Sequence, residues 1–394
     1  MDIHRLNHAQ LIKGVSMSFQ RFLSRKINWD SRLIGIFGAR GVGKTTLLLQ
    51  HIKSVFGDAD KALYLPLDNI WFQIGGLAQT VKDFCAAGGT HLFLDNVHRY
   101  EDWMPTVAKF AETYPELRIV FVTSSLIPSN KLKRTFKEDA AFYTLPTMSF
   151  REYLDYEGAL EMEPYSLDEL LLNHADIVQK VMDEINVVPI FRNYLEHGCY
   201  PFYWEDPDAY FFRLEDMMSD SVDIDLPAIV SSDYGMQHKI KQLLLFLATA
   251  APEIPRIPEI TKSLKLDNAQ IHKFMEYIEA MGVIRILQSS DSMPELRLRK
   301  SYLANTNLLA SLFREEGRIY TGETFFVDQM SNCASVEMFP NNDFRINGKY
   351  TFAVGDPLMD FKRIGNGENM FGAINGLPKS SGNRMPIWVL GLCY

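Results

Sequence analysis

The chain is 394 residues long, with 47% hydrophobic and 23% charged residues, the proportions of an ordinary globular protein. This length predicts two or three domains, each able to bury a core. The formal net charge is −9, so no overall positive field draws the chain to nucleic acid or to an anionic membrane. The composition therefore excludes a strongly basic binding protein, although a local basic patch is compatible with it.

Cysteine spacing and hydropathy indicate the compartment. The four cysteines lie far apart and form no C-x-x-C pair, which predicts reduced thiols rather than a disulfide framework or a zinc site. The first residues contain no apolar signal core, and the longest apolar run, Leu243–Pro252, is too short to span a bilayer. We expect a cytoplasmic protein with no membrane partner.

Residues 1–30 are predicted to form a helical N-terminal segment, and a glycine-rich loop follows them. Residues 38–45 read G-A-R-G-V-G-K-T and fit the phosphate-binding pattern G-x-x-x-x-G-K-[ST] completely. The apolar run Arg32–Phe37 before the loop is typical of a buried parallel strand, and Thr45–Lys53 after it predicts a helix. The alternative is a chance glycine turn before a helix. The expected nucleotide-binding residues are Gly38, Ala39, Arg40, Gly41, Val42, Gly43, Lys44, Thr45 and Thr46.

The chemistry of this loop predicts a nucleotide ligand together with Mg²⁺, and the resemblance described below implies that the nucleotide is ATP or ADP. Glycines let backbone N–H groups converge on phosphate oxygens, and the helix N-terminus adds a partial positive charge. Lys44 is expected to reach the β- and γ-phosphates, and the Thr45 hydroxyl to ligate Mg²⁺. The ATP-over-GTP preference follows from the resemblance described below, since no guanine-reading Asn-Lys-x-Asp stretch is present.

A second metal ligand is expected further along the chain. Ala62–Asp68 reads as a strand and Leu77–Cys85 as an amphipathic helix, and His91–Asp95 then has the form of a Walker B strand ending in an acid. Ligands of α/β sheets bind at the carboxyl ends of strands, so Asp95 is expected to hold Mg²⁺. The alternative is an acid that merely ends the strand.

The residue after Asp95 bears on catalysis. P-loop enzymes of the AAA type usually carry a glutamate there, which polarises the attacking water, but this chain has Asn96. An amide can orient water but cannot accept its proton. We therefore predict slow or absent hydrolysis, with a substitute role for Glu101 or His98 as the alternative. Nucleotide binding is expected in either case.

The remaining strands complete a doubly wound sheet. Arg118–Ser125 reads as a buried strand ending in hydroxyls, and Ser124 is the candidate sensor of the γ-phosphate; a hydroxyl capping the next turn is the alternative. Ala140–Leu145 supplies the last strand.

The second half of the chain begins with helices. Residues 149–230 read as helical, and Met236–Leu298 reads as three helices and a hairpin that pairs Val283–Leu287 with Leu296–Leu298, the order of a winged helix-turn-helix. The third helix exposes a mixed set of charges rather than a basic face, so an intramolecular or protein contact is favoured over DNA. Its exposed residues are Gln270, Lys273, Glu276 and Glu279.

The last segment, 301–394, predicts an α/β module. A helix is expected to begin at Glu323–Val327, and Asp343–Phe352 reads as a hairpin with a type I′ turn at Asn347-Gly348. The apolar run Ile387–Leu392 is predicted to be a buried strand.

These motifs together resemble a large group of bacterial and archaeal AAA-like ATPases that carry a C-terminal domain of unknown function. The resemblance covers nearly the whole chain. The stretches that carry it are Arg32–Gly35, Gly38–Leu47, Ala62–Tyr64, Leu67-Asp68, Leu92–Asp95, Trp103, Phe121, Ser124-Ser125, Leu145-Pro146, Ser149–Leu154, Gly198–Phe202, Tyr302–Leu308, Glu323–Phe326, Pro386–Trp388 and Leu390–Tyr394.

The resemblance implies four modules. These are a P-loop core with strand order 5-1-4-3-2 at 1–150, a helical lid segment at 151–235, a winged helix at 236–300 and a nuclease-like α/β domain at 301–394. It also implies that the turn at Gly198–Pro201 contacts the nucleotide, as a glycine-proline turn does in related switch ATPases.

Three departures from the family pattern affect catalysis. Asn96 replaces the glutamate. The basic pair at a plausible arginine-finger position is replaced by Glu138-Asp139, with Arg134 as a nearby substitute. The nuclease-like module keeps Glu323 and Asp343 but has Phe352–Pro357 where the family has a further carboxylate and a lysine, so we predict no nuclease activity.

The sequence thus predicts an ATP-binding AAA-like protein that acts as a nucleotide-dependent switch with weak or absent hydrolysis. Its protein partner is unknown. The alternatives are an active ATPase coupled to DNA or protein remodelling, and a winged-helix regulator that binds nucleic acid.

Overall fold

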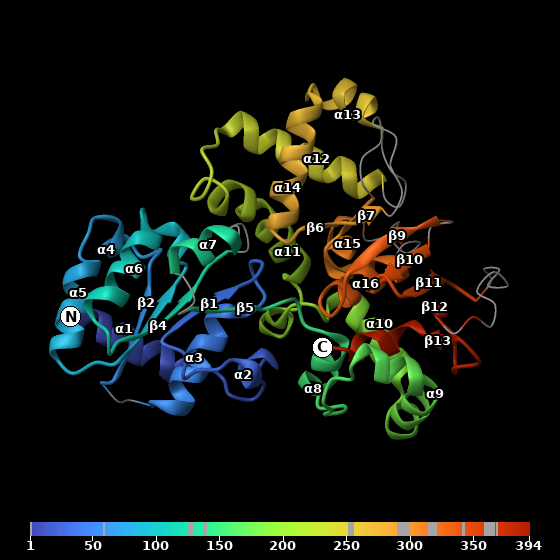
Figure 1. The fold of residues 1–394 in the computed structure, drawn as a ribbon, viewed down its shortest axis with the longest axis horizontal. Coiled ribbons are helices and arrows are strands. Elements are labelled where there is room, and N and C mark those ends of the chain that lie inside the picture. Colours follow the sequence, from blue (N-terminus) through green and yellow to red (C-terminus); the bar gives the residue numbers. More distant parts are fainter. Residues whose placement is uncertain are drawn as a thin grey trace. The chain divides into compact units, whose positions relative to one another are not determined.

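The computed structural model describes residues 2–57, 60–124, 129–136, 140–250, 256–289, 300–313, 321–340, 343–357, 367 and 369–394. The chain divides into two compact units (Figure 1). The first comprises Met1–Pro146 and Asp220–Tyr234, and the second comprises Thr147–Ser219 and Gly235–Tyr394. The segment 220–234 therefore belongs to the first unit, although the chain on both sides of it belongs to the second.

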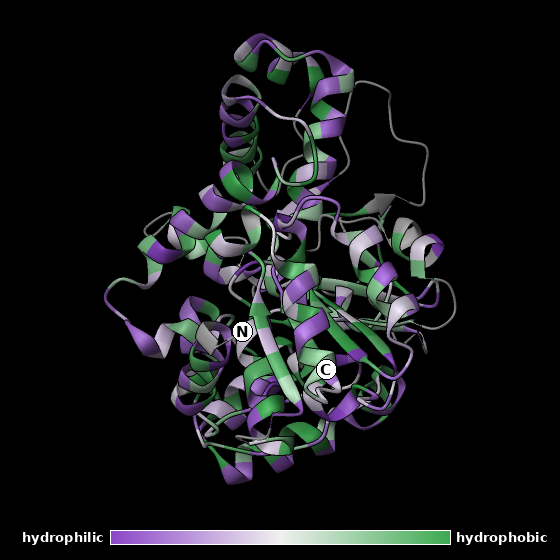
Figure 2. Ribbon diagram, turned by 90° about the vertical axis from the view of Figure 1, so that its left-hand side faces the viewer, coloured by the Kyte–Doolittle hydropathy of each residue, from purple (hydrophilic) through white to green (hydrophobic). Residues whose placement is uncertain are grey.

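The first unit is built on a five-stranded sheet with the order β2-β3-β4-β1-β5. The strands are β1 (Leu33–Phe37), β2 (Ala62–Pro66), β3 (His91–Asp95), β4 (Arg118–Val122) and β5 (Ala140–Thr144). All neighbours pair in parallel, with Pro66 opposite Asp95 and Ile36 opposite Val122. The predicted order 5-1-4-3-2 and the α/β fold class are confirmed. Strands β1 to β4 are buried almost throughout, which explains their near-continuous apolar runs in the sequence, whereas β5 is only half-buried. Figure 2 shows the distribution of hydrophobic residues, in green, along the chain.

Helices cover both faces of this sheet. On one face α5 (Leu77–Ala86), α6 (Trp103–Thr113) and α7 (Ser129–Phe136) close a large apolar core over Leu63, Leu92 and Phe121. On the other face α3 (Lys44–Val55) packs against α1 (Asp2–Gly14), and its Gln50 amide donates to the backbone carbonyls of Ser16 and Phe19. The short helices α2 (Leu23–Lys26), α4 (Ile70–Gln73) and η1 (Val97–Arg99) lie in the connections.

The second unit begins with helices and ends in a mixed sheet. Its first helices are α8 (Phe150–Tyr156), α9 (Leu167–Glu184), α10 (Val187–His197), η3 (Pro201–Glu205) and α11 (Tyr210–Asp220), whose last residue lies in the first unit together with η4 (Ser221–Asp225). Then follow α12 (Tyr234–Ala250), α13 (Ile257–Leu264), α14 (Asn268–Ala280), α15 (Thr306–Leu312) and α16 (Thr321–Ser331). Three consecutive helices, α12 to α14, precede the small antiparallel pair β6 (Ile284–Ile286) and β8 (Ser301–Leu303).

The six-stranded sheet of the second unit has the order β13-β12-β11-β10-β9-β7. Its strands are β7 (Gln288–Ser289), β9 (Val336–Phe339), β10 (Asp343–Ile346), β11 (Tyr350–Gly355), β12 (Met370–Ile374) and β13 (Arg384–Pro386). Strands β10 and β11 are antiparallel, and Asn347 and Gly348 between them both have positive φ, as a type I′ turn requires. Helix α16 begins at Thr321, close to the predicted helix start at Glu323.

The second unit differs from the sequence expectation at one buried segment. The apolar run Ile387–Leu392 is a fully buried 3-10 helix, η8, and not the predicted strand. A short continuous apolar run has no periodicity that separates a strand from a helix, so burial was foreseeable and conformation was not. For the predicted hairpin, Leu296–Leu298 lie outside the described residues, and Ile284–Ile286 pairs with Ser301–Leu303.

The turn at Gly198–Pro201 is part of the core of the second unit. A Cβ on Gly198 would lie 2.4 Å from Cδ2 of Tyr194, so only glycine fits there. The backbone N–H of Cys199 donates to Oδ1 of Asn307 at 2.7 Å, and the hydroxyl of Tyr200 accepts from the Asn305 amide at 2.9 Å. These bonds account for the residue types at the turn. Its contact with nucleotide stays a prediction.

No helix among the described residues is both long and apolar enough to cross a lipid bilayer.

Candidate nucleotide site

The glycine loop joins β1 to α3 and has the backbone geometry that its sequence predicts. Gly41 and Gly43 have φ values of 81° and 95°, in the left-handed region that favours glycine. A Cβ on Gly38 would lie 2.4 Å from the carbonyl oxygen of Leu145, so this position excludes any side chain. Gly43 is the N-cap of α3, and the loop therefore ends at the N-terminus of a twelve-residue helix, where anions bind favourably.

Lys44, the first residue of α3, folds its side chain back over the loop. Its Nζ donates to the carbonyl oxygens of Gly38 at 2.9 Å and Ala39 at 2.7 Å. Desolvation lowers the pKa of Lys44 to about 8; the negative charges of Asp95 and Asp225 oppose this shift, and Arg40 adds to it. The Lys44 ammonium, held at the loop in this way, can exchange its carbonyl contacts for a phosphate oxygen with little movement of the side chain.

Thr45 and Asp95 lie together, as the sequence predicts for a Mg²⁺ site. The Thr45 hydroxyl donates to Oδ2 of Asp95 at 2.5 Å, although the two residues belong to different elements, α3 and β3. Asp95 is 1% exposed. A hydroxyl and a carboxylate are hard oxygen ligands of the kind that Mg²⁺ takes, usually with waters and phosphate oxygens completing the octahedron. These two side chains fit the metal.

Tyr64 on β2 is a further contact of the same carboxylate, and the sequence motifs do not predict it. Its hydroxyl donates to Oδ2 of Asp95 at 2.8 Å, while the backbone N–H of Asn96 donates to Oδ1 at 2.9 Å. Burial, followed by the nearby Asp95 charge and hydrogen bond, raises the pKa of Tyr64, so the phenol stays protonated and donates. The only indication in the sequence was that Tyr64 places a hydroxyl group within an otherwise apolar predicted strand.

Asn96 takes an unusual backbone conformation and is bound to a neighbouring strand end. Its φ is 52°, which asparagine tolerates better than most residues. Its side-chain amide donates to Oδ2 of Asp68, which follows β2, at 3.2 Å. The guanidinium of Arg99 lies 3.6 Å from the same oxygen. In the sequence, Asp68 ends a predicted strand, and no pattern there gives it a role.

Arg40 connects the glycine loop to the segment 220–234. Its Nε and a terminal nitrogen bind both carboxylate oxygens of Asp225, at 3.2 and 2.9 Å, and it lies 3.6 Å from Asp220. Burial of Asp225 favours the neutral acid, but the His98 hydrogen bond and the Arg40 charge outweigh it, so the pKa of Asp225 lies below its ordinary value. No sequence pattern marked Asp225.

His98 uses both of its ring nitrogens. Its Nδ1 accepts from the backbone N–H of Ser124 at 3.3 Å, so in the neutral ring Nε2 carries the proton and faces Oδ1 of Asp225 at 3.5 Å. The ring is 5% exposed. A histidine with both nitrogens occupied is poorly placed to take a proton from water, and Glu101 is exposed at the surface.

Two hydroxyls lie at the end of β4, where the sequence predicts a sensor. Ser124 contributes its backbone N–H to His98, as described. The neighbouring Thr123 is fully buried, and its hydroxyl has no hydrogen-bond partner in the described part of the chain. Thr123 is therefore a second candidate for the sensor role that the sequence gave to Ser124. Ser125, Glu138 and Asp139 lie outside the described residues, and Arg134 on α7 is exposed.

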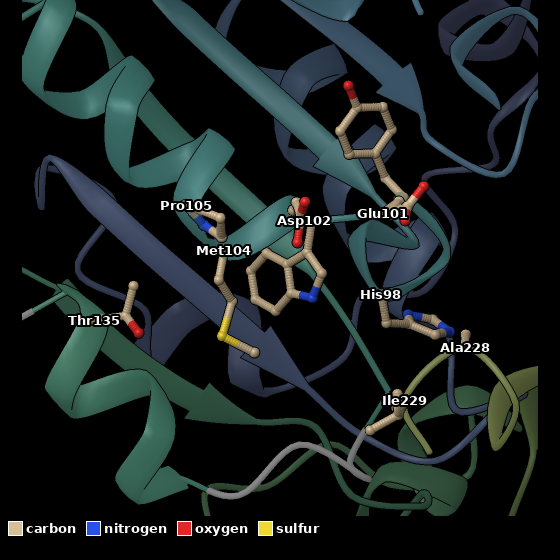
Figure 3. A pocket seen from close by; sticks show the side chains of 10 residues that line it. His98, Glu101, Asp102, Met104, Pro105, Thr135, Ala228 and Ile229 are labelled. Atoms are coloured by element: carbon tan, nitrogen blue, oxygen red, sulfur yellow. The ribbon is translucent and has the colours of Figure 1, made fainter. Parts of the chain in front are cut away.

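A cavity of about 560 Å³ lies beside His98 in the first unit (Figure 3). Trp103, Met104 and Ile229 give it an apolar wall, and Glu101 and Asp102 give it acidic groups. In the view of Figure 3, His98 and Ala228 lie on the side opposite Thr135. The cavity therefore borders both the end of the Walker B strand and the segment 220–234.

Glu323, which the sequence singled out in the C-terminal segment 301–394, pairs with a buried cation. Glu323 accepts hydrogen bonds from Lys300, at 3.2 Å, and from the hydroxyl of Tyr302. Lys300 is 3% exposed, so Glu323 serves as the counter-charge of a buried cation. Within the described ranges, no group of three or more histidine, cysteine or acidic residues is placed to hold a metal ion.

Comparison with known families identifies the class of the first unit. Residues 30–154 match the family model described as an AAA domain. With the sheet order and the glycine loop, this match gives residues 30–154 the fold of an AAA-type P-loop NTPase, and it supports a nucleotide-binding P-loop protein. No curated protein matches the chain.

Several solved structures of AAA proteins align with the chain at low similarity. AMPPCP-bound DnaA from Aquifex aeolicus has 14% identity and a TM-score of 0.24, with 68% of this chain and 86% of that chain covered. PCH-2 from C. elegans has 13% identity and a TM-score of 0.24, with coverages of 70% and 66%. Overlaps at this score do not establish a common arrangement of the whole chain, and no role of these proteins is transferred on their account.

Proposed function

We propose that the chain is a Mg·ATP-dependent conformational switch that hydrolyses its nucleotide slowly. The observation that carries the proposal is the pairing of Arg40, in the glycine loop, with Asp225, in a segment far along the sequence. This pairing supplies what a switch needs, namely a direct chemical link between the ligand-binding loop and an element that a ligand can release.

Nucleotide binding is supported by the geometry of the loop. The N-terminus of α3, the Lys44 ammonium and the positive-φ glycines together form the kind of cradle that binds phosphates. Thr45 and Asp95 would hold Mg²⁺, which when bound neutralises charge on the β- and γ-phosphate oxygens. Tyr64 would hold the Asp95 carboxylate in place for that ion.

The switching step follows from competition for Arg40. A guanidinium binds a phosphate as well as a carboxylate through the same two N–H groups, so a triphosphate in the loop would compete with Asp225. Release of Asp225 would free η4 and the rest of 220–234 from the loop. Because that segment is continuous with α11 and α12, its release would be passed along the backbone to the second unit.

Slow hydrolysis follows from Asn96. The amide of Asn96 cannot accept a proton, and both nitrogens of His98 are occupied. Glu101 is exposed at the surface. A bound nucleotide would therefore persist, which suits a switch better than a motor.

The decisive experiment combines Mg·ATP binding by calorimetry with phosphate release, for the wild type, Lys44→Ala and Asn96→Glu. We expect binding by the wild type that Lys44→Ala abolishes, and slow release that Asn96→Glu accelerates. Rapid wild-type turnover would show that the protein is a working ATPase and not a switch. Absence of Mg·ATP binding would overturn the whole proposal.

A further inference from the structure

The end of β2 places a carboxylate next to the residue that should activate water. Pro66 pairs with Asp95, and the N–H of Leu67 donates to the carbonyl of Asp95 at 2.9 Å, so β2 and β3 stay in register to their last residues. Asp68 follows immediately, and its Oδ2 accepts from the Asn96 amide at 3.2 Å. Parallel strands in register bring their carboxyl ends to one edge of the sheet, where ligands bind.

The carboxylate of Asp68 retains a free acceptor. Its contacts with Asn96 and with Arg99, at 3.6 Å, both involve Oδ2, and Oδ1 has no hydrogen bond to any residue that the structure describes. The side chain is 31% exposed, so water reaches it. Of the candidate bases at this edge, His98 has no nitrogen available and Asn96 has no basicity, whereas Asp68 has both a lone pair and access to water.

We propose that Asp68 is the general base for the slow ATP hydrolysis of this protein, with the Asn96 amide holding its carboxylate and orienting the attacking water. The inference rests on the proposed function, because it concerns the reaction at that nucleotide site. As the water oxygen bonds to the γ-phosphorus, its proton passes to the Asp68 carboxylate. The bond from that phosphorus to the β–γ bridging oxygen breaks, giving ADP and phosphate, and the proton then leaves to solvent.

The same contacts explain why the reaction is slow. Asp68 follows β2, whereas an AAA-type glutamate at position 96 would follow β3. In addition, Oδ2 of Asp68 is already shared between Asn96 and Arg99. The base therefore works through Oδ1 alone, from a neighbouring strand. A glutamate at position 96 would bring the carboxylate onto the Walker B strand itself.

The test uses the full chain and compares the wild type with Asp68→Asn, Asp68→Ala and Asp83→Asn. Asn at position 68 can still accept from the Asn96 amide but cannot take a proton. General base catalysis contributes at least about 100-fold, so we expect phosphate release to fall about 100-fold in Asp68→Asn with an unchanged Kd for Mg·ATP. Asp83 lies on the surface of α5, where it accepts a hydrogen bond from Gln79, and Asp83→Asn should behave as the wild type.

Chemical rescue separates a base from a structural role. Added formate should restore part of the phosphate release of Asp68→Ala, where it can occupy the space of the lost carboxylate, and should not help Asp68→Asn. Asp68→Asn/Asn96→Glu should also regain turnover, which shows that the altered site still folds. The inference is overturned if Asp68→Asn releases phosphate at the wild-type rate, or if the wild type is no faster than Lys44→Ala. Either result with normal Mg·ATP binding leaves the proposed switch intact, whereas loss of wild-type binding overturns both.

Discussion

Tyr64 and Asp95 are joined by a 2.8 Å hydrogen bond between neighbouring strands, from the phenol to the carboxylate oxygen that Thr45 also contacts. The bond fixes the orientation of the acid that is expected to hold Mg²⁺. Partners of this kind commonly affect metal affinity nearly as much as the ligands themselves.

Tyr64→Phe removes only this hydroxyl from a buried ring. Because the carboxylate loses one of its two Oδ2 donors, we expect Mg²⁺ to be required at about 10-fold higher concentration for tight ATP binding. ATP binding without Mg²⁺ should be unchanged. Calorimetric titrations with and without Mg²⁺ measure both quantities, and Tyr100→Phe, on a residue near the cavity rather than the metal site, is the matched control. An unaltered Mg²⁺ requirement would show that Tyr64 has no part in placing Asp95.

Asp225→Asn tests the link between the loop and the segment 220–234. The substitution weakens the two bonds to Arg40, so the segment should exchange its amide hydrogens faster without nucleotide than in the wild type. In the wild type, Mg·ATP should produce the same acceleration. Hydrogen–deuterium exchange with mass spectrometry resolves this segment. Asp216→Asn, on the exposed surface of α11, should leave the exchange rates unchanged. If Mg·ATP instead slows exchange in 220–234, the release step is wrong.

Acid should weaken the same pair in a predictable direction. The pKa of Asp225 lies below its ordinary value of 3.8, so the stabilisation from its ionised form is complete above that value and is lost as the pH falls through the lower folded-state pKa. At neutral pH we expect Asp225→Asn to lower the free energy of unfolding by about 2 kcal/mol. This difference should shrink only below pH 3.8. Urea unfolding of both proteins across the acid range measures it, and a difference already lost near pH 6 would point to another titrating group.

The nucleotide loop was predictable because it depends on a local pattern. A complete G-x-x-x-x-G-K-[ST] match between an apolar run and a helix leaves little conformational freedom, and the strand ending in Asp95 could be recognised from the same reasoning. The strand order was predicted from the family resemblance and not from these local patterns.

The partners of that loop were not predictable in the same way. Asp225 reaches Arg40 from a segment that no periodicity distinguishes, and the roles of Tyr64 and Asp68 depend on the register between β2 and β3. Register and long-range contact arise from packing of the whole unit. For the run Ile387–Leu392, burial could be predicted from its apolar composition, but its 3-10 conformation could not.

Lys300 and Glu323 provide a test of the C-terminal module, residues 301–394, that does not depend on nucleotide. Lys300 is almost completely buried, and Glu323, 3.2 Å away, balances its charge. Glu323→Gln would leave a buried cation without its counter-charge and should lower the free energy of unfolding by about 3 kcal/mol. Lys300→Met replaces the cation with an apolar side chain of similar length and should cost less. The double variant should then be more stable than Glu323→Gln alone, since the unbalanced charge is gone. Urea unfolding of the four proteins gives the coupling energy directly. If the Glu323→Gln substitution raised stability and the protein gained stability from added Mg²⁺ or Mn²⁺, Glu323 would be a metal ligand and the module a working metal site.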